Sequence, residues 1–192
     1  MPPEIVEMTD NFMKNPVKIL VKNQQLTLEG IKQFYISLQE DSQKFGTLLQ
    51  LYKNMTIAQC MVFTNRKERV KELADRLTEH KFVVSCISGD MEMSDRVNIM
   101  KDFRSGSTRI LISTDLLGRG IDIQQVNLII NYDLPSNPSQ YIHRIGRSGR
   151  FGRKGVAINF VTSGDAQFLA NLRQYYNTQI EELPLDLKNI YD

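Results

Sequence analysis

The sequence RILISTD, residues 109–115, decides the fold class, because its apolar residues run on without the polar alternation of a half-exposed strand. The sequence NLII at 127–130 has the same character. Strands that are apolar on both faces belong to a parallel sheet that is covered by helices on each side. We therefore expect two buried strands here, each followed by polar residues.

Outward from these stretches, strand-like segments alternate with segments of helical period from about residue 30 onward. In the segment 70–77, the apolar residues fall at i, i+3, i+4 and i+7, as in an amphipathic helix. Gly106 is placed where the helix before it should end. We predict strands at 31–38, 59–64, 83–87, 109–113, 127–132 and 155–161, and helices at 41–54, 66–80, 94–104, 138–145 and 164–176. This alternation predicts an α/β fold with an open parallel β-sheet and helices on both faces.

The composition is that of a globular protein, with 192 residues, 41% hydrophobic and 24% charged. No apolar run is long enough to cross a bilayer, and no secretory leader opens the sequence, so we expect a cytosolic or nuclear protein without membrane contact. The two cysteines lie in apolar stretches, and two scattered histidines do not suggest a metal site. A net charge of +2 gives no overall sign of a nucleic-acid binder.

Polar residues follow several of the predicted strands, at 65–67, 88–90, 114–122 and at Asp133. In an open parallel sheet, ligands bind beyond the carboxyl ends of the strands. These segments are far apart in sequence, yet the predicted topology brings them to one edge of the sheet. The sequence therefore predicts a ligand site at this edge.

The segment HRIGRSGRFGRKG, residues 143–155, repeats arginine and glycine at every third position. Its glycines make a regular helix costly, and arginine is the side chain suited to planar, bidentate phosphate recognition. We interpret the segment as a loop that places guanidinium groups against phosphates. The alternative is a solvated basic loop without a ligand.

These residues resemble the motifs of DEAD-box RNA helicases. HRIGRSGR at 143–150 resembles the last helicase motif, and STD at 113–115 with RGID at 119–122 resembles the motif before it. MVFTN at 61–65, and GDM at 89–91 with Arg96, are similar to two earlier motifs, and all four occur in the family's order. The segments LTLEGI, IQQV and NYDLP are similar to the initiation factor 4A group of that family.

The resemblance implies that the chain is the second of two RecA-like domains. We expect residues 1–25 to be a linker, 26–177 the RecA-like domain and 178–192 a C-terminal tail. The phosphate-loop and Asp-Glu-Ala-Asp motifs of the first domain do not occur in this sequence. The chain alone is therefore expected to be inactive as an ATPase and as a helicase.

The resemblance also implies residue roles, with ATP and Mg²⁺ held mainly by the absent first domain and no metal ligand in this chain. The residues expected to act on the nucleotide are the arginine fingers Arg147 and Arg150, with Gly120 and Asp122 as further contacts. The residues expected to bind single-stranded RNA are Asn65, Gly89, Asp90, Arg96 and Thr114. Those expected to couple the two domains are Arg119, His143 and Arg144.

The resemblance further implies a role in translation initiation, in the cytoplasm, for a monomer that contacts the scaffold initiation factor 4G. Two alternatives stay open: an exon-junction-type paralogue, and a stand-alone module that binds a scaffold without catalysis. Three residues depart from the family pattern, namely Ser88 for histidine, Met93 for glutamine and Gly118 for alanine. The first two put side-chain contacts at these positions in question.

Overall fold

A computed structural model describes residues 28–115, 126–148 and 155–191 of the chain. Its centre is a seven-stranded sheet in the order β3-β4-β2-β5-β6-β1-β7, in which each neighbouring pair of strands is parallel. The strands are β1 (Ile31–Ser37), β2 (Cys60–Phe63), β3 (Val84–Ile87), β4 (Ile110–Ser113), β5 (Leu128–Asn131), β6 (Gly155–Val161) and β7 (Glu181–Glu182). The predicted parallel α/β sheet is confirmed.

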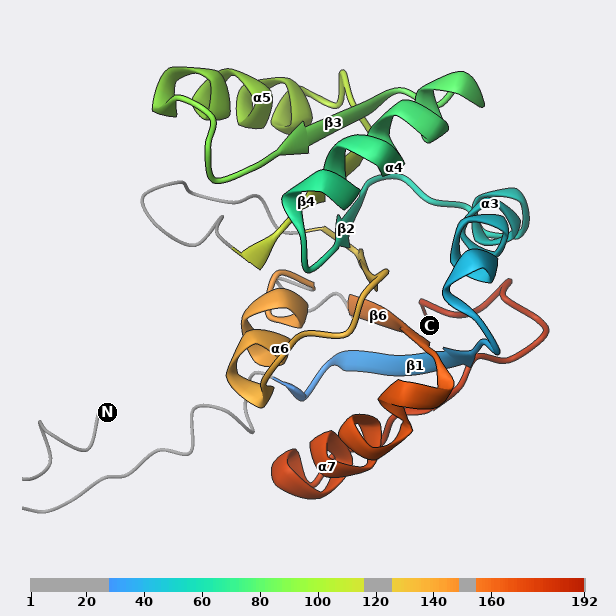
Figure 1. The fold of residues 1–192 in the computed structure, drawn as a ribbon. Helices are drawn as coiled ribbons and strands as arrows, with labels where there is room; N and C mark the ends of the chain where they lie inside the picture. The colour runs from blue at the N-terminus through green and yellow to red at the C-terminus, as the bar shows by residue number, and fades with distance from the viewer. Residues whose placement is uncertain (1–27, 116–125, 149–154, 192) are drawn as a thin grey trace, which may run out of the picture.

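Helices cover both faces of this sheet (Figure 1). The helical elements are η1 (Asp41–Gln43), α3 (Lys44–Asn54), α4 (Lys67–Glu79), α5 (Met93–Ser105), α6 (Pro138–Ile145), η3 (Ser163–Asp165) and α7 (Ala166–Tyr176). Helices α3 and α4 pack on one face, and α5, α6 and α7 pack on the other. Gly106 follows α5 with a φ of 81°, the left-handed conformation predicted for a residue that ends a helix.

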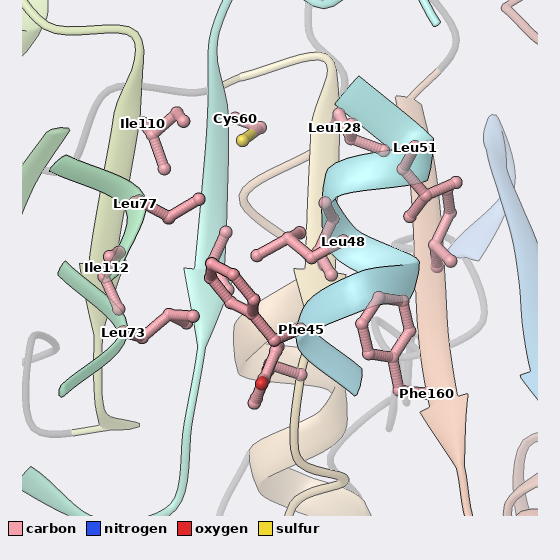
Figure 2. Close-up of a cluster of buried hydrophobic side chains, with 14 of the residues drawn as sticks. Phe45, Leu48, Leu51, Cys60, Leu73, Leu77, Ile110, Ile112, Leu128 and Phe160 are labelled. Atoms are coloured by element: carbon pink, nitrogen blue, oxygen red, sulfur yellow. The ribbon is translucent and has the colours of Figure 1, made fainter. Parts of the chain in front are cut away.

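The buried strands alternate their side chains between the two helical layers. Cys60 and Val62 of β2 pack with α3 and α4, whereas Met61 and Phe63 pack with α5. Figure 2 shows the first of these cores, where side chains of α3 and α4 meet those of the central strands. Each central strand is thus apolar on both sides, which is why its sequence shows no polar alternation.

The residues predicted as a C-terminal tail form part of the domain. β7 pairs in parallel with β1, and Leu183 donates its backbone N–H to the carbonyl of Tyr35. Ile180 and Ile190 are buried in the two largest cores. This segment therefore extends the sheet, while the predicted linker at 1–25 lies outside the described residues. Over the part of the chain that the structure describes, no helix has the length and apolar character to span a membrane.

Burial of the Cys60 thiol predicts a loss of stability at alkaline pH. Burial raises the pKa of Cys60 to about 12, whereas an unfolded thiol ionises near pH 8.5. The stabilisation is complete below the unfolded pKa and falls as pH rises, because only the unfolded state then releases the proton. Between about pH 8.5 and 9.5, below the tyrosine range, we expect the free energy of unfolding to fall by up to about 1.4 kcal/mol per pH unit.

Urea unfolding of the wild type and of Cys60→Ala at several pH values measures this slope. Cys60→Ala should flatten it, and Cys86→Ala, which alters the less buried thiol, should keep most of it. Equal slopes in the wild type and Cys60→Ala would show that another group causes the pH dependence.

Candidate nucleic-acid interface

A pocket of about 500 Å³ lies beyond the carboxyl ends of four neighbouring strands. Its lining residues are Asn65 and Lys67 after β2, Gly89 and Asp90 after β3, Thr114 and Asp115 after β4, and Ser136 and Gln140 after β5. Parallel pairing brings these loops together although they span some 75 residues of sequence. The structure thus brings four of the five residues expected to bind RNA into one pocket.

Thr114 has an unused hydroxyl at this pocket. The residue is 6% exposed, and its Oγ1 is the one buried side-chain nitrogen or oxygen among the described residues that lacks a hydrogen-bond partner. A buried polar atom without a partner is costly in a folded protein. The Thr114 hydroxyl therefore keeps an unused hydrogen-bonding capacity, in a residue that lines the pocket.

The turn after β3 is held by side chains on both sides. The Ser88 hydroxyl donates to the Asp90 carboxylate, and this bond lowers the pKa of Asp90. Lys67 lies 3.5 Å from the same carboxylate. Ser88, which replaces the family's histidine, therefore has a definite role in fixing Asp90.

Arg96 braces the same turn from α5, on which it lies half-buried and outside the pocket lining. Its Nε donates to the carbonyl of Met91 at 3.0 Å, and its Nη2 donates to the carbonyl of Gly89 at 2.6 Å. These bonds use two of the five guanidinium donors. A phosphate contact by Arg96 stays a prediction, and any such contact would come from the remaining donors.

The guanidinium of Arg144 ties together the loops that form the pocket. It is 1% exposed. It donates through Nε and Nη2 to the carboxylate of Asp115 at 2.5 and 2.6 Å, and through Nη2 to Oδ1 of Asn65 at 2.7 Å. Nη1 donates to the carbonyl of Asp133 at 2.6 Å and to Oδ1 of Asn131 at 3.3 Å. All five donors of the group are therefore used within the domain.

This arrangement changes how Arg144 can couple the two domains. A direct contact between its guanidinium and another domain would compete with the five internal bonds. Its neighbour His143 is exposed on α6 and has no such constraint. We infer that Arg144 positions Asn65 and Asp115, and that the expected interdomain contact, which stays a prediction, falls more naturally to His143.

Arg147 lies beyond the end of α6 and is not part of the pocket lining. Its backbone N–H donates to the carbonyl of Arg144 at 3.2 Å, and its carbonyl accepts from the N–H of Val126 at 3.0 Å. These bonds place its backbone beside the start of β5, with the residue partly exposed. Four other predicted residues lie outside the described parts of the chain: Arg119, Gly120, Asp122 and Arg150.

Four residues of the pocket had no individual role predicted from the sequence, although two of them lie in the polar segments 65–67 and 114–122 that were predicted to line this edge. Lys67, Asp115, Ser136 and Gln140 line the pocket. The place of Lys67 and Asp115 directly after predicted strands was a usable signal. Ser136 and Gln140 stand among ordinary loop and helix residues, so no sequence pattern distinguished them.

The family described as the helicase conserved C-terminal domain matches residues 43–152, more than half of the chain. The chain belongs to this family, and its fold is the RecA-like fold of DEAD-box C-terminal domains. It covers 93% of the solved C-terminal domain of the DEAD-box protein Dbp5, with 38% identity and a TM-score of 0.76. It also matches yeast (S. cerevisiae) Dbp5 bound to RNA and ADP BeF3, with 34% identity and a TM-score of 0.82 over 97% of this chain and 50% of that one.

The curated relatives narrow the resemblance to one group. The chain is 56% identical over 190 residues to the eukaryotic initiation factor 4A of Caenorhabditis elegans, which covers 99% of this chain and 47% of that protein. It is 57% identical over 190 residues to the ATP-dependent RNA helicase eIF4A of Aspergillus clavatus, covering 99% of this chain and 48% of that protein. The chain thus spans about half the length of these relatives.

Replacement of Arg144 by lysine should destabilise the domain although it keeps the charge. Lysine has three donors and no planar fork, so Asn65, Asp115 and Asp133 would lose hydrogen bonds in a buried site. We expect the free energy of unfolding to fall by about 2–4 kcal/mol. Urea unfolding measures this change, with the exposed Arg66→Lys as the control. Equal stability of the two variants would refute the positioning role.

Proposed function

We propose that the chain is the C-terminal half of an ATP-dependent RNA helicase of the initiation factor 4A type. The observation that carries the proposal is the pocket in which Asn65, Gly89, Asp90 and Thr114 meet, with the Thr114 hydroxyl unused. The relatives named above support the helicase activity and the place in translation initiation. On this proposal the protein acts in the cytoplasm as a monomer.

The pocket suits the backbone of single-stranded RNA better than its bases. Its described lining offers two amides, two hydroxyl groups, a lysine and main-chain groups beside the carboxylates of Asp90 and Asp115. It includes no aromatic side chain on which a base could stack. Groups of this kind contact phosphate and sugar, which position a strand without reading its sequence. We therefore propose that RNA binds here without sequence specificity.

The nucleotide would be held mainly by a first RecA-like domain, together with Mg²⁺. We assign Arg147 and Arg150 as the arginine fingers of this chain, with Gly120 and Asp122 as further nucleotide contacts. Negative charge spreads over the phosphoryl oxygens in the transition state, and a positioned guanidinium contributes about 10³–10⁵ in rate. The partly exposed Arg147, fixed by main-chain bonds beside Arg144, supports this assignment.

A site divided between two domains couples RNA and ATP. Both ligands would contact both domains, so each favours the closed form and each raises the affinity of the other. Arg119, His143 and Arg144 are the residues that we propose for the coupling, Arg144 acting through Asn65 and Asp115. The scaffold initiation factor 4G is the further partner that we propose.

Loss of either proposed arginine finger should reduce catalysis when the chain is joined to a first RecA-like domain. We expect Arg147→Ala and Arg150→Ala each to lower the RNA-stimulated ATPase kcat by about tenfold or more, because transition-state charge loses its partner. Steady-state ATPase assays measure the change, and the exposed Arg109→Ala, just before the amino end of β4, is the control. Full activity of both finger variants would remove the assignment.

Arg96→Ala tests whether the brace on the Gly89 turn also binds phosphate. In the same two-domain protein, a lost phosphate contact on a single strand should reduce the slope of log affinity against log salt by about 0.7. RNA titrations at several salt concentrations measure the slope, with the exposed Lys101→Ala on the same helix as the control. Weaker binding with an unchanged slope would mean that Arg96 only braces the turn.

A further inference from the structure

Four charged side chains form a closed ring under the end of β5. Lys44 Nζ lies 2.9 Å from Oδ1 of Asp133 and 2.8 Å from Oδ1 of Asp41. Arg69 pairs with the same two carboxylates, through Nη1 with Asp133 at 2.5 Å and through Nη2 with Asp41. Positive and negative groups thus alternate around the ring, which joins η1, α3, α4 and the end of β5.

The ring is asymmetric in its exposure to solvent. The side chains of Lys44 and Asp133 are 5% and 9% exposed, whereas that of Asp41 is 52% exposed. The two cations lower the pKa of Asp41 against the opposing effect of partial burial. A buried ion pair contributes little net stability compared with apolar residues of similar size. Stability alone therefore does not explain why Lys44 and Asp133 are buried as an ion pair.

The contacts of the Asp133 carboxylate indicate a positioning role for this pair. Oδ1 receives both cations of the ring, and Oδ2 accepts the backbone N–H of Asn65 at 3.1 Å. The Asn65 side chain is fixed as well, since its Nδ2 donates to the carbonyl of Leu134 at 2.7 Å. The Asp133 carboxylate therefore links the ring to the pocket, because its Oδ2 holds Asn65, which is one of the residues that line the pocket.

We propose that Lys44 is a positioning residue for the RNA pocket and that it acts through Asp133 on Asn65. The inference rests on the proposed function. It assigns a role in RNA binding to Lys44 of α3, which lies outside the pocket lining. Lys44 fixes the rotation of the Asp133 carboxylate. Without Lys44, Arg69 alone would hold Oδ1 of Asp133, and Arg69 is also paired with the exposed Asp41. The Asn65 backbone would then lose its fixed acceptor.

The test compares Lys44→Met with Lys53→Met in the chain joined to a first RecA-like domain. Lys53 is the matched control because it lies on the same helix, exposed, in the last turn. Lys44→Met should raise the RNA concentration for half-maximal ATPase stimulation by about fivefold, an effect typical of a lost positioning contact, with kcat at saturating RNA and KM for ATP nearly unchanged. Lys53→Met should match the wild type.

A loss of kcat together with a higher KM for ATP would indicate general damage and would overturn the inference, as would wild-type RNA dependence in Lys44→Met. Should Lys44→Met fail to fold, Lys44→Leu carries the same test, because it also removes the donor to Asp133. Circular dichroism and thermal unfolding establish which variants are folded.

A double-mutant cycle with Asn65→Ala separates this inference from the proposed function. Asn65→Ala should weaken RNA binding by itself. Lys44→Met should then add little, because the backbone N–H at position 65 remains but the side chain that it positions is absent. Independent, multiplicative effects of the two changes would overturn the role of Lys44 while leaving the pocket intact. An Asn65→Ala variant with unchanged RNA binding would remove both the pocket and the inference.

Discussion

The site depends on one buried guanidinium. The loops that line the pocket follow four different strands, and parallel pairing fixes the strands but not the side chains beyond them. Arg144 binds the loop after β2 through Asn65, the loop after β4 through Asp115 and the end of β5 through Asp133. Burying a charge is costly unless it is paired and fully hydrogen-bonded, and the Asp115 carboxylate with three further oxygens meets that condition.

Two polar systems extend this anchor to both sides of the sheet. On the side of α3 and α4, the charged ring holds the Asp133 carboxylate. On the other side, a chain of side-chain hydrogen bonds leads from Asn131 through Asn159 and Tyr141 to Gln33. Every one of these groups has a hydrogen-bond or ion-pair partner, which favours this one arrangement at the base of the pocket. In contrast, the hydroxyl of Thr114, a residue that lines the pocket, has no hydrogen-bond partner among the described residues.

The sequence predicts those parts of the structure whose stabilising interactions leave a pattern in the order of the residues. Apolar runs and helical periodicity mark the core, so the strands and helices were predicted within a few residues, and parallel topology predicted where the polar loops meet. Strand β7 left no such mark, because its two exposed glutamates pair only through the backbone. The predicted helix at 138–145 is present as α6, but no sequence pattern indicated that this helix buries the guanidinium of Arg144. Lys44 looked like an ordinary helix residue, since partners distant in sequence cause its burial.

The contacts that hold Asn65 bear on how a single domain would bind RNA under the proposed function. If the loops became ordered only on contact with RNA, the ordering would oppose binding even after the domains had closed. Here Arg144 and the charged ring hold Asn65 and the neighbouring loops within the domain itself. The entropy cost of ordering these loops therefore belongs to folding and not to RNA binding. On the proposed function, a low affinity of the single domain would reflect contacts that a first RecA-like domain supplies. On that proposal, closure of the two domains would add its full contact energy to RNA binding. This is the condition under which a nucleotide between the domains could control RNA binding.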